Sequence, residues 1–379
     1  MPPDVSDWIS NPAELATRLA MAAPRVGMDT EFVRERTWWP KLALVQIALE
    51  DGSILLVDPL VPGMNAVLAA LLADPAVTKV MHSPSEDLMA FKHACGVVPA
   101  PLFDTQAAAA LAGVAGGAGY QRLVQDMLGV ALAKGETRSD WMRRPLSAAQ
   151  LEYAADDVRY LFALHDDLDA RLQALGRRDW LAADSARMVD NASNDELESW
   201  PHLAMRSAQF LDRDGQLRLL RLLRWRDAHA RRSDKPRGWI LDNELAAALA
   251  RRPPADRNAL QQQLESTPKA PRTLGDAIWQ ALDTPLDDED VAPLARADDR
   301  DKALMRKLQD AVAALGAELG LPDGMLASRR WLQLLVDAWA EGRRDDWPGP
   351  LAGWRRGLLE PRLAPLLDKD AGGRPAPSV

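Results

Sequence analysis

The strongest constraint on the fold of this chain is the order of its strand and helix patterns. Three strand-like runs, at residues 25–32, 42–49 and 53–60, come before any long helical pattern. Strand-like and helical patterns then alternate, and from about residue 147 onward every periodic segment has helical spacing. This order predicts an α/β or α+β first domain, with a mixed sheet and helices, followed by an all-α region. A dinucleotide-binding fold is not expected, because no G-x-G-x-x-G motif follows the first strand.

The length of the chain predicts more than one domain. At 379 residues it exceeds the size at which a single hydrophobic core usually keeps growing, so two or three domains are expected. Two acidic stretches, at residues 191–201 and 284–301, have the composition of linkers. The expected organisation is a first domain over 1–195, helical domains over 201–285 and 300–368, and a disordered tail over 369–379.

The composition excludes several classes of protein. Cys95 is the only cysteine, which rules out an internal disulfide framework and a thiolate zinc site. The N-terminal segment is acidic and lacks the basic-then-apolar order of a signal peptide. The longest apolar stretch, which begins at Ala107, is too short to span a bilayer. We therefore expect a cytoplasmic protein with no membrane partner.

Two carboxylates interrupt the first strand pattern. The segment "VGMDTEF" begins as a buried strand, yet Asp29 and Glu31 follow where the chain should still lie in the core. Side chains two residues apart on a strand point to the same face, so these two acids converge. Two neighbouring anions resist ionisation unless a positive charge lies between them. The pair therefore indicates a cation site, although acidic pairs at strand ends also occur for solubility.

Further acids lie in two helical segments. Asp87 opens the helical segment "SEDLMAF", where carboxylates are also favoured by the helix dipole alone. Ser147 and Gln150 form the capping-box pattern of a second helix. On that helix, Tyr153 and Asp157 are four residues apart and share one face.

These acids together predict a hard-metal site. If Asp29, Glu31, Asp87 and Asp157 meet in one pocket, only oxygen ligands line it, and such ligands select Mg²⁺ or Mn²⁺. Four carboxylates can hold two such ions about 4 Å apart, the arrangement that serves phosphodiester cleavage. The alternative is that they bind only a structural cation.

A basic segment stands out in an otherwise acidic chain. The net charge is −9, but residues 201–275 hold 15 basic and 8 acidic residues, a net of +7. Arg224 and Arg231 belong to this segment. A local basic face with aromatic residues can bind phosphate, whereas the plainer interpretation is a solvated helix face.

Three motifs carry a resemblance to a known family. "MDTEFVRERTWWPKLALVQIA", "HSPSEDLMAF" and "GETRSDWMRRPLSAAQLEYAADDVRYL" resemble, in order and spacing, the exonuclease motifs of the DEDD superfamily. They are most similar to its tyrosine-bearing branch and to the ribonuclease D family. The resemblance covers roughly residues 10–175. It implies a ribonuclease H-like fold and metal-dependent 3′→5′ removal of nucleoside 5′-monophosphates from RNA.

The resemblance also assigns roles at the site. It implies that Asp29, Glu31, Asp87 and Asp157 bind two divalent cations, Mg²⁺ or Mn²⁺, and that Tyr153 orients the attacking water. It further implies trimming of structured RNAs with a free 3′ end, such as tRNA precursors, by a monomer. A 3′→5′ DNA exonuclease and a catalytically silent RNA-binding module stay open as alternatives.

The remaining chain resembles two HRDC modules, which are small helical bundles often used for nucleic-acid contact. The segment "LLRWRDAHARRSDKPRGWILDNELAAALARRPPA" is similar to one, and the region from "LGLPDGML" onward to a divergent second copy. The first is expected to hold the RNA through its arginines. The second is acidic overall and is expected either to close against the catalytic domain or to limit which substrates enter. The expected substrate-binding residues are Phe32, Trp38, Trp39, Arg138, Arg224 and Arg231, of which the aromatic ones could instead be packing residues. Trp141, close to Arg138, is also expected on the substrate side.

Overall fold

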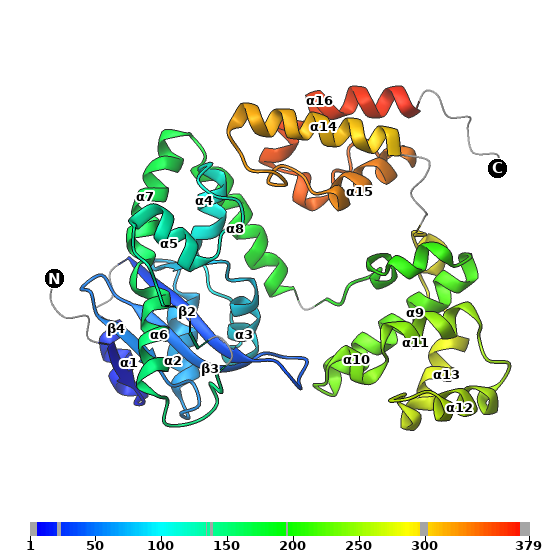
Figure 1. The fold of residues 1–379 in the computed structure, drawn as a ribbon, viewed down its shortest axis with the longest axis horizontal. Coiled ribbons are helices and arrows are strands. Elements are labelled where there is room, and N and C mark those ends of the chain that lie inside the picture. Colours follow the sequence, from blue (N-terminus) through cyan, green and yellow to red (C-terminus); the bar gives the residue numbers. More distant parts are fainter. Residues whose placement is uncertain are drawn as a thin grey trace. The chain divides into compact units, whose positions relative to one another are not determined.

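The computed structural model describes residues 6–20, 24–133, 135–136, 139–194, 196–295 and 302–371. Their contacts divide the chain into two compact units, whose elements are labelled in Figure 1. The first unit comprises Met1–Val33, Lys41–Asn194 and Arg300–Val379, and the second comprises Arg34–Pro40 and Asp195–Asp299. The first unit is thus assembled from segments that are far apart in the sequence.

A six-stranded sheet forms the centre of the first unit, with strand order β1-β4-β3-β2-β5-β6. β3 runs antiparallel to β2 and β4, whereas the pairs β1–β4, β2–β5 and β5–β6 are parallel. This confirms the expected mixed sheet; β1 was not predicted. The strands are β1 Ser6–Ile9, β2 Arg25–Val33, β3 Lys41–Ala48, β4 Ile54–Val57, β5 Thr78–Met81 and β6 Leu102–Asp104.

Helices cover both faces of this sheet (Figure 1). Leu44 and Ala48 of β3 join a core with helices α6 and α7, and the alternate residues Val45 and Ile47 join a core with α1, α2 and α3. Because both faces are covered, β3 is buried almost throughout. The helices are α1 Pro12–Leu19, α2 Met64–Ala73, α3 Ser85–Cys95, α4 Thr105–Leu111, α5 Tyr120–Leu128, α6 Ala148–Arg159, α7 Leu161–Ala174 and α8 Arg178–Ser193.

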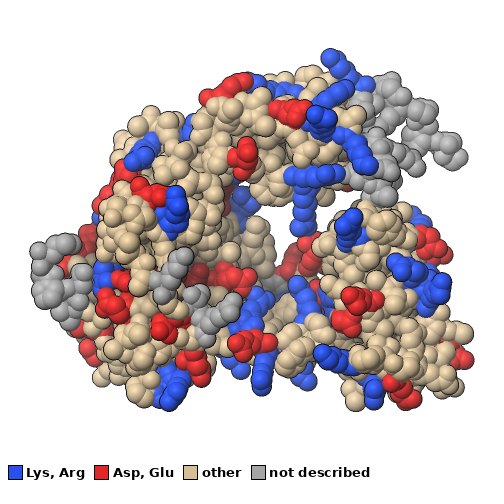
Figure 2. Space-filling model, viewed as in Figure 1, with Lys and Arg blue, Asp and Glu red and all other residues tan. Residues whose placement is uncertain are grey.

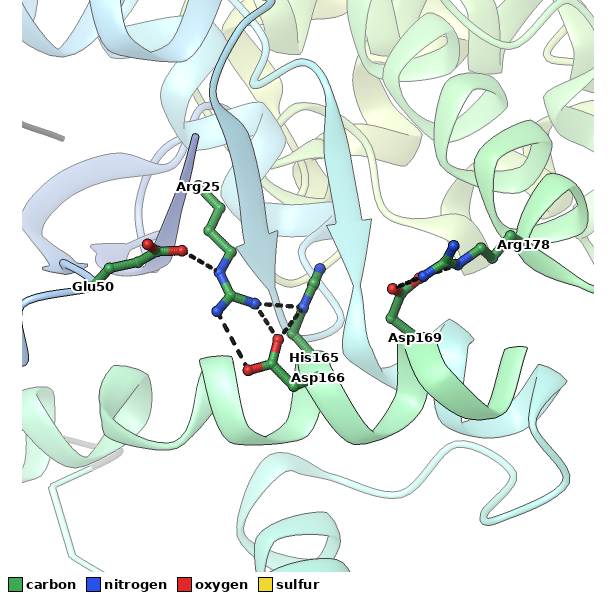
Figure 3. A network of polar contacts seen from close by, with 6 residues as sticks. All are labelled: Arg25, Glu50, His165, Asp166, Asp169 and Arg178. Atoms are coloured by element: carbon green, nitrogen blue, oxygen red, sulfur yellow. Dashed lines mark hydrogen bonds and ion pairs between the residues drawn. The ribbon is translucent and has the colours of Figure 1, made fainter. Parts of the chain in front are cut away.

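Arg25, the first residue of β2, joins this strand to α7 (Figure 3). Its guanidinium donates to Glu50 Oε1 at 2.6 Å, to His165 Nδ1 at 2.8 Å and to the carboxylate of Asp166. The same guanidinium lies 4.8 Å from the centre of the Phe162 ring. These contacts fix the start of the strand whose later residues are Asp29 and Glu31.

The second unit is an all-helical bundle around a separate core. The acidic stretch 284–301, expected as a linker, is partly folded onto it: Glu289 is buried and accepts a 2.6 Å hydrogen bond from Arg221. The elements are η1 Pro201–Ala204, η2 Arg206–Phe210, α9 Arg213–Arg232, α10 Arg237–Ile240, α11 Asn243–Arg251, α12 Arg257–Ser266, η3 Arg272–Leu274, α13 Gly275–Asp283 and η4 Glu289–Val291.

A second helical bundle closes the chain and belongs to the first unit. Its elements are α14 Lys302–Leu319, α15 Arg329–Ala340, η5 Gly349–Leu351 and α16 Trp354–Ala371. The two all-α regions expected from the sequence are thus confirmed. Of the predicted tail, residues 372–379 lie outside the described residues, and the exact domain boundaries stay predictions.

This last bundle packs against α8 of the first unit. The rings of Trp180 and Trp354 stack 4.2 Å apart and nearly parallel. Beside them, Arg355 donates two hydrogen bonds to the carboxylate of Asp184, at 2.6 and 2.8 Å. Arg177 also donates to the carbonyl oxygen of Leu319 at 2.6 Å. The contact therefore combines aromatic stacking with a buried, bidentate ion pair.

Candidate active site

β2 supplies the first two acids of the site. Asp29 and Glu31 alternate along the strand with Thr30, so the two acids face one side of the sheet and Thr30 the other. A β-bulge follows directly between Glu31 and Phe32. Bulges turn a strand locally and re-aim its side chains, and this one shifts the register immediately after the two acids, before the pairing resumes at Phe32 opposite Leu42.

The turn after β5 brings in the third acid. Ser83 adopts a positive φ of 53°, and its N–H donates to Asp104 Oδ1 at 2.9 Å. This turn starts α3, whose first turn carries Asp87. The hydroxyl of Thr30 donates a hydrogen bond to the Asp87 carboxylate. The residue between the two strand acids therefore positions the third one.

Helix α6 supplies the fourth acid and the tyrosine. The predicted capping box is present: Gln150 N–H donates to Ser147 Oγ at 3.2 Å, and Ser147 N–H donates to Gln150 Oε1 at 3.0 Å. One turn apart on this helix, the Tyr153 side chain is hydrogen-bonded to Asp157. The ring of Tyr153 contacts the buried ring of Trp141, 6.1 Å away between centres. We expected Trp141 on the substrate side; it lies in the core instead.

The electrostatics show that the four acids share one site. Burial raises the pKa of Asp29 well above its usual value, and the negative charges of Asp87, Asp157 and Glu31 raise it further. Burial likewise raises the pKa of Glu31 to about 9, with added repulsion from Asp157 and Asp87. Carboxylates raise one another's pKa in this way only when they lie close together.

The pKa values of the other two acids are also raised. For Asp87 the pKa rises to about 6, because burial outweighs the hydrogen bond from Thr30. For Asp157 it rises to about 7, through burial and the charge of Asp156, against the hydrogen bond with Tyr153. All four acids therefore lie in surroundings that disfavour their ionised forms.

Such a donor set fits hard divalent cations. It offers carboxylate oxygens, which Mg²⁺ and Mn²⁺ prefer. Among the described residues, no group of three or more His, Cys, Asp or Glu side chains has an arrangement that would hold a metal ion as it stands. Mg²⁺ commonly binds to proteins through one or two carboxylates and completes its shell with water and substrate phosphate, so it does not require a preformed cage.

The three aromatic residues that were predicted to bind substrate belong to different units. Phe32 is partly buried and packs against the core that contains α1, α2 and α3. Trp38 and Trp39 lie in the segment Arg34–Pro40, which belongs to the second unit. There both backbone N–H groups donate to Asp234 Oδ1 at 3.0 Å. The structure does not bring these two tryptophans and the four acids together in one unit.

The predicted arginines also differ in their surroundings. Arg224 donates two hydrogen bonds to Asp288, at 2.8 and 2.9 Å, and one to the carbonyl of Ser199. Arg231 lies over the Trp39 ring, 5.2 Å from its centre. Arg138 lies outside the described residues. On the face drawn in Figure 2, basic side chains over α9–α13 are mixed with acidic ones.

Sequence reasoning missed three residues near the acids. Thr30 holds Asp87, as described above. Tyr120 of α5 is buried enough for its pKa to rise well above the usual value, and the charges of Asp157 and Asp29 add to this rise. Gln46 of β3 is directly opposite Asp29 in the sheet register. Its polar side chain in a buried strand was the only signal in the sequence.

Models of known protein families match most of the chain. Residues 6–173 match the family model of the 3′-5′ exonuclease, residues 216–282 that of the HRDC domain, and residues 300–363 that of the ribonuclease D C-terminal HRDC domain. The chain is 60% identical to ribonuclease D of Xanthomonas oryzae pv. oryzae over 363 residues, which cover 95% of this chain and 98% of that protein. It is 36% identical to ribonuclease D of Pseudomonas paraeruginosa, with 95% and 97% covered.

A solved structure of a ribonuclease D also matches the fold of this chain. The crystal structure of Escherichia coli RNase D matches with a TM-score of 0.83 at 28% identity, covering 96% of this chain and 99% of that one. The sheet and its helices are therefore those of a 3′→5′ exonuclease, a fold that generally uses divalent metal ions. The chain belongs to the ribonuclease D family and is a 3′→5′ exoribonuclease that acts on RNA. In the described part of the chain, no helix is both long and apolar enough to cross a membrane.

Proposed function

We propose that this exoribonuclease trims the 3′ ends of structured RNA precursors, tRNA precursors among them, and releases nucleoside 5′-monophosphates one at a time. Support comes from the E. coli structure, which is described as an exoribonuclease involved in structured RNA processing. We further propose that the enzyme works as a monomer in the cytoplasm, where RNA precursors are made. Light scattering of the purified protein tests the monomer, and sequencing of RNA 3′ ends in a deletion strain tests the substrates.

We propose Asp29, Glu31, Asp87 and Asp157 as the ligands of two divalent cations, Mg²⁺ or Mn²⁺. The observation that carries this assignment is the proximity of the four carboxylates: burial raises the pKa of Glu31 to about 9, and the charges of Asp157 and Asp87 add to this rise, as those of Asp87, Asp157 and Glu31 do for Asp29. When bound, the cations would supply activation of water and stabilisation of the leaving 3′ oxygen.

Tyr153 is assigned the role of orienting the attacking water. Support for this role comes from the hydrogen bond of Tyr153 with Asp157 and from its ring contact with Trp141. A phenolic hydroxyl can both donate and accept a hydrogen bond, which suits a residue that positions a water molecule.

A single RNA experiment tests the activity and the site. An RNA hairpin with a 3′ overhang, labelled at its 5′ end, is incubated with wild type in Mg²⁺, in Mn²⁺ and in chelator. The expected result is a metal-dependent ladder that shortens from the 3′ end, lost in Asp157→Asn. The matched control is Asp156→Asn, on the same helix but paired with Arg159. Equal loss in both variants would refute the site assignment, and equal activity on DNA would make the enzyme a general exonuclease.

For RNA binding we propose the α9–α10 corner of the second unit. Arg232, Lys235 and Arg237 are at least partly exposed there, next to the predicted Arg231. Arg224 is engaged by Asp288, so its replacement would also disturb the bundle. We therefore test the corner with Arg232→Glu and Lys235→Glu together.

The corner variant should weaken RNA binding and make the dependence of log K on log salt shallower, by about one unit for each phosphate that the protein no longer neutralises. Hydrolysis of a dinucleotide should not change, because the four acids are untouched. The same salt dependence as wild type would argue against this corner. The other expected substrate-binding residues, Phe32, Trp38, Trp39 and Arg138, stay predictions.

A further inference from the structure

Gln46 lies beside the first acid of the site. The register pairs it directly with Asp29 across β2 and β3, which places the two side chains on the same face of the sheet. Its neighbours on that face, Leu44 and Ala48, pack in the core with residues of α6. Directly opposed residues have Cβ atoms about 4.5–5.5 Å apart, within reach of a glutamine side chain.

The amide of Gln46 is buried without a hydrogen-bond partner. The residue has 0% exposure, and neither Nε2 nor Oε1 has a partner among the described protein groups. An unpaired buried amide costs about 1–3 kcal/mol of stability. An apolar side chain of similar volume would fill this position without that cost, so the amide destabilises the protein unless it gains a partner. A buried orphan amide next to a functional carboxylate calls for an explanation in the site itself.

The neighbouring carboxylate is a suitable acceptor. Asp29 already accepts a hydrogen bond from the backbone N–H of Thr30. Carboxylates that bind metal are generally held by further hydrogen bonds, which fix the direction of the oxygen that faces the ion. An amide N–H can provide such a bond without adding charge, so it does not compete with the cation.

We propose that Gln46 is a positioning residue for Asp29: in the cation-loaded site, its Nε2–H donates to one carboxylate oxygen and leaves the other directed at the cation. This inference rests on the proposed cation site. It adds a residue on β3 to a constellation otherwise supplied by β2, α3 and α6.

The test compares Mn²⁺ affinity and stability in the full chain. Gln46→Met keeps the length and most of the volume of the side chain but removes the amide. Mn²⁺ binding is measured by electron paramagnetic resonance without RNA, and thermal unfolding is measured in chelator. We expect Mn²⁺ affinity to fall about 10–100-fold, while the metal-free melting temperature stays equal or rises because the orphan amide is gone.

Leu44→Met is the matched control, because it alters the same strand and face but removes no hydrogen-bond donor. It should leave Mn²⁺ affinity unchanged. Gln46→Leu is a second variant, which also removes the amide donor and makes the position apolar, and it should lose affinity like Gln46→Met.

Either variant binding Mn²⁺ as tightly as wild type overturns the role of Gln46, and so does an equal loss in Leu44→Met. If wild type itself binds no Mn²⁺ and does not shorten RNA, the proposed function fails as well. The inference is supported only if wild type and Leu44→Met bind Mn²⁺ equally well and both Gln46 variants lose Mn²⁺ affinity.

Discussion

The ion pair between Asp184 and Arg355 offers a sharp test of how the last bundle is held on α8. The pair is nearly buried, with side-chain exposures of 12% and 4%. Asp184→Asn removes one charge and keeps the shape, so it leaves the guanidinium of Arg355 buried without its counter-ion. Removing one partner of a buried pair typically costs about 3–5 kcal/mol.

The surroundings of Arg355 indicate that Asp184→Asn destabilises the docked bundle by an amount at the lower end of that range. Arg355 keeps a 3.2 Å hydrogen bond to the carbonyl of Met325 and its position 4.1 Å from the centre of the Trp354 ring. The asparagine also retains one acceptor oxygen. We therefore expect a loss of about 3 kcal/mol, which corresponds to roughly a hundredfold change in an equilibrium constant.

Hydrogen exchange of α16 measures this loss directly, because undocking of the bundle exposes that helix. Asp184→Asn should speed exchange in α16 about a hundredfold. The matched control is Glu318→Gln, which breaks a pair with Arg362 whose side chains are 54% and 41% exposed. Exposed pairs contribute about 0–1 kcal/mol, so the control should change exchange by about fivefold at most.

The pH dependence gives an independent check. Although burial favours the protonated form, the hydrogen bonds and charges of Arg355 and Arg187 hold the pKa of Asp184 below its usual value. The pair therefore stabilises the bundle at every pH above about 4, and this stability is lost as the pH falls further. Equal exchange in Asp184→Asn and Glu318→Gln at neutral pH would refute the reasoning.

Three further predictions concern the acidic site. In chelator, the melting temperature should fall as the pH rises from about 5 to about 9. Folding raises the pKa of Glu31 from 4.5 to about 9, so stability that is fully present below pH 4.5 is lost as the pH rises through about 9. Calorimetry of Asp29→Asn should show a smaller fall, and a fall as steep as that of wild type would contradict this. Tyr153→Phe should lower kcat about a hundredfold while RNA affinity and melting temperature stay the same; a matching loss of RNA affinity would argue for a binding role. Ser147→Ala should remove about 1 kcal/mol from the start of α6, seen as several-fold faster exchange there, and unchanged exchange would mean that the capping box contributes nothing.

The parts of the fold predicted from sequence depend on local patterns. The helical segment "SEDLMAF" lies in α3, Ser85–Cys95, and the helix predicted from its capping box is α6, with Ser147 as its N-cap. The strand β1 was missed because it has only four residues and its partner, β4, lies far along the chain, with Ser6 opposite Ile54. Short strands are specified by such distant pairing rather than by their own periodicity.

In the site, too, local patterns predict some features, whereas others depend on contacts between distant parts of the chain. The convergence of Asp29 and Glu31 follows from the two-residue period of a strand, and that of Tyr153 and Asp157 from the helical turn. Nothing in the local sequence could place Gln46 beside Asp29, because that depends on the register of β2 and β3. The role of Trp141 was misjudged for the same reason: only the packed fold shows that it supports the tyrosine.

The discontinuous first unit has a consequence for synthesis on the ribosome. Asp184 and Arg355 are separated by 171 positions, and the main part of the second unit, Asp195–Asp299, is made between them. While those residues are translated, the surface of α8 around Trp180 is therefore not yet packed against α16. The two helices can pack together only after α16 has left the exit tunnel. Because Trp354 and Arg355 lie in the first turn of α16, a chain that stopped before this helix would leave the surface around Trp180 exposed.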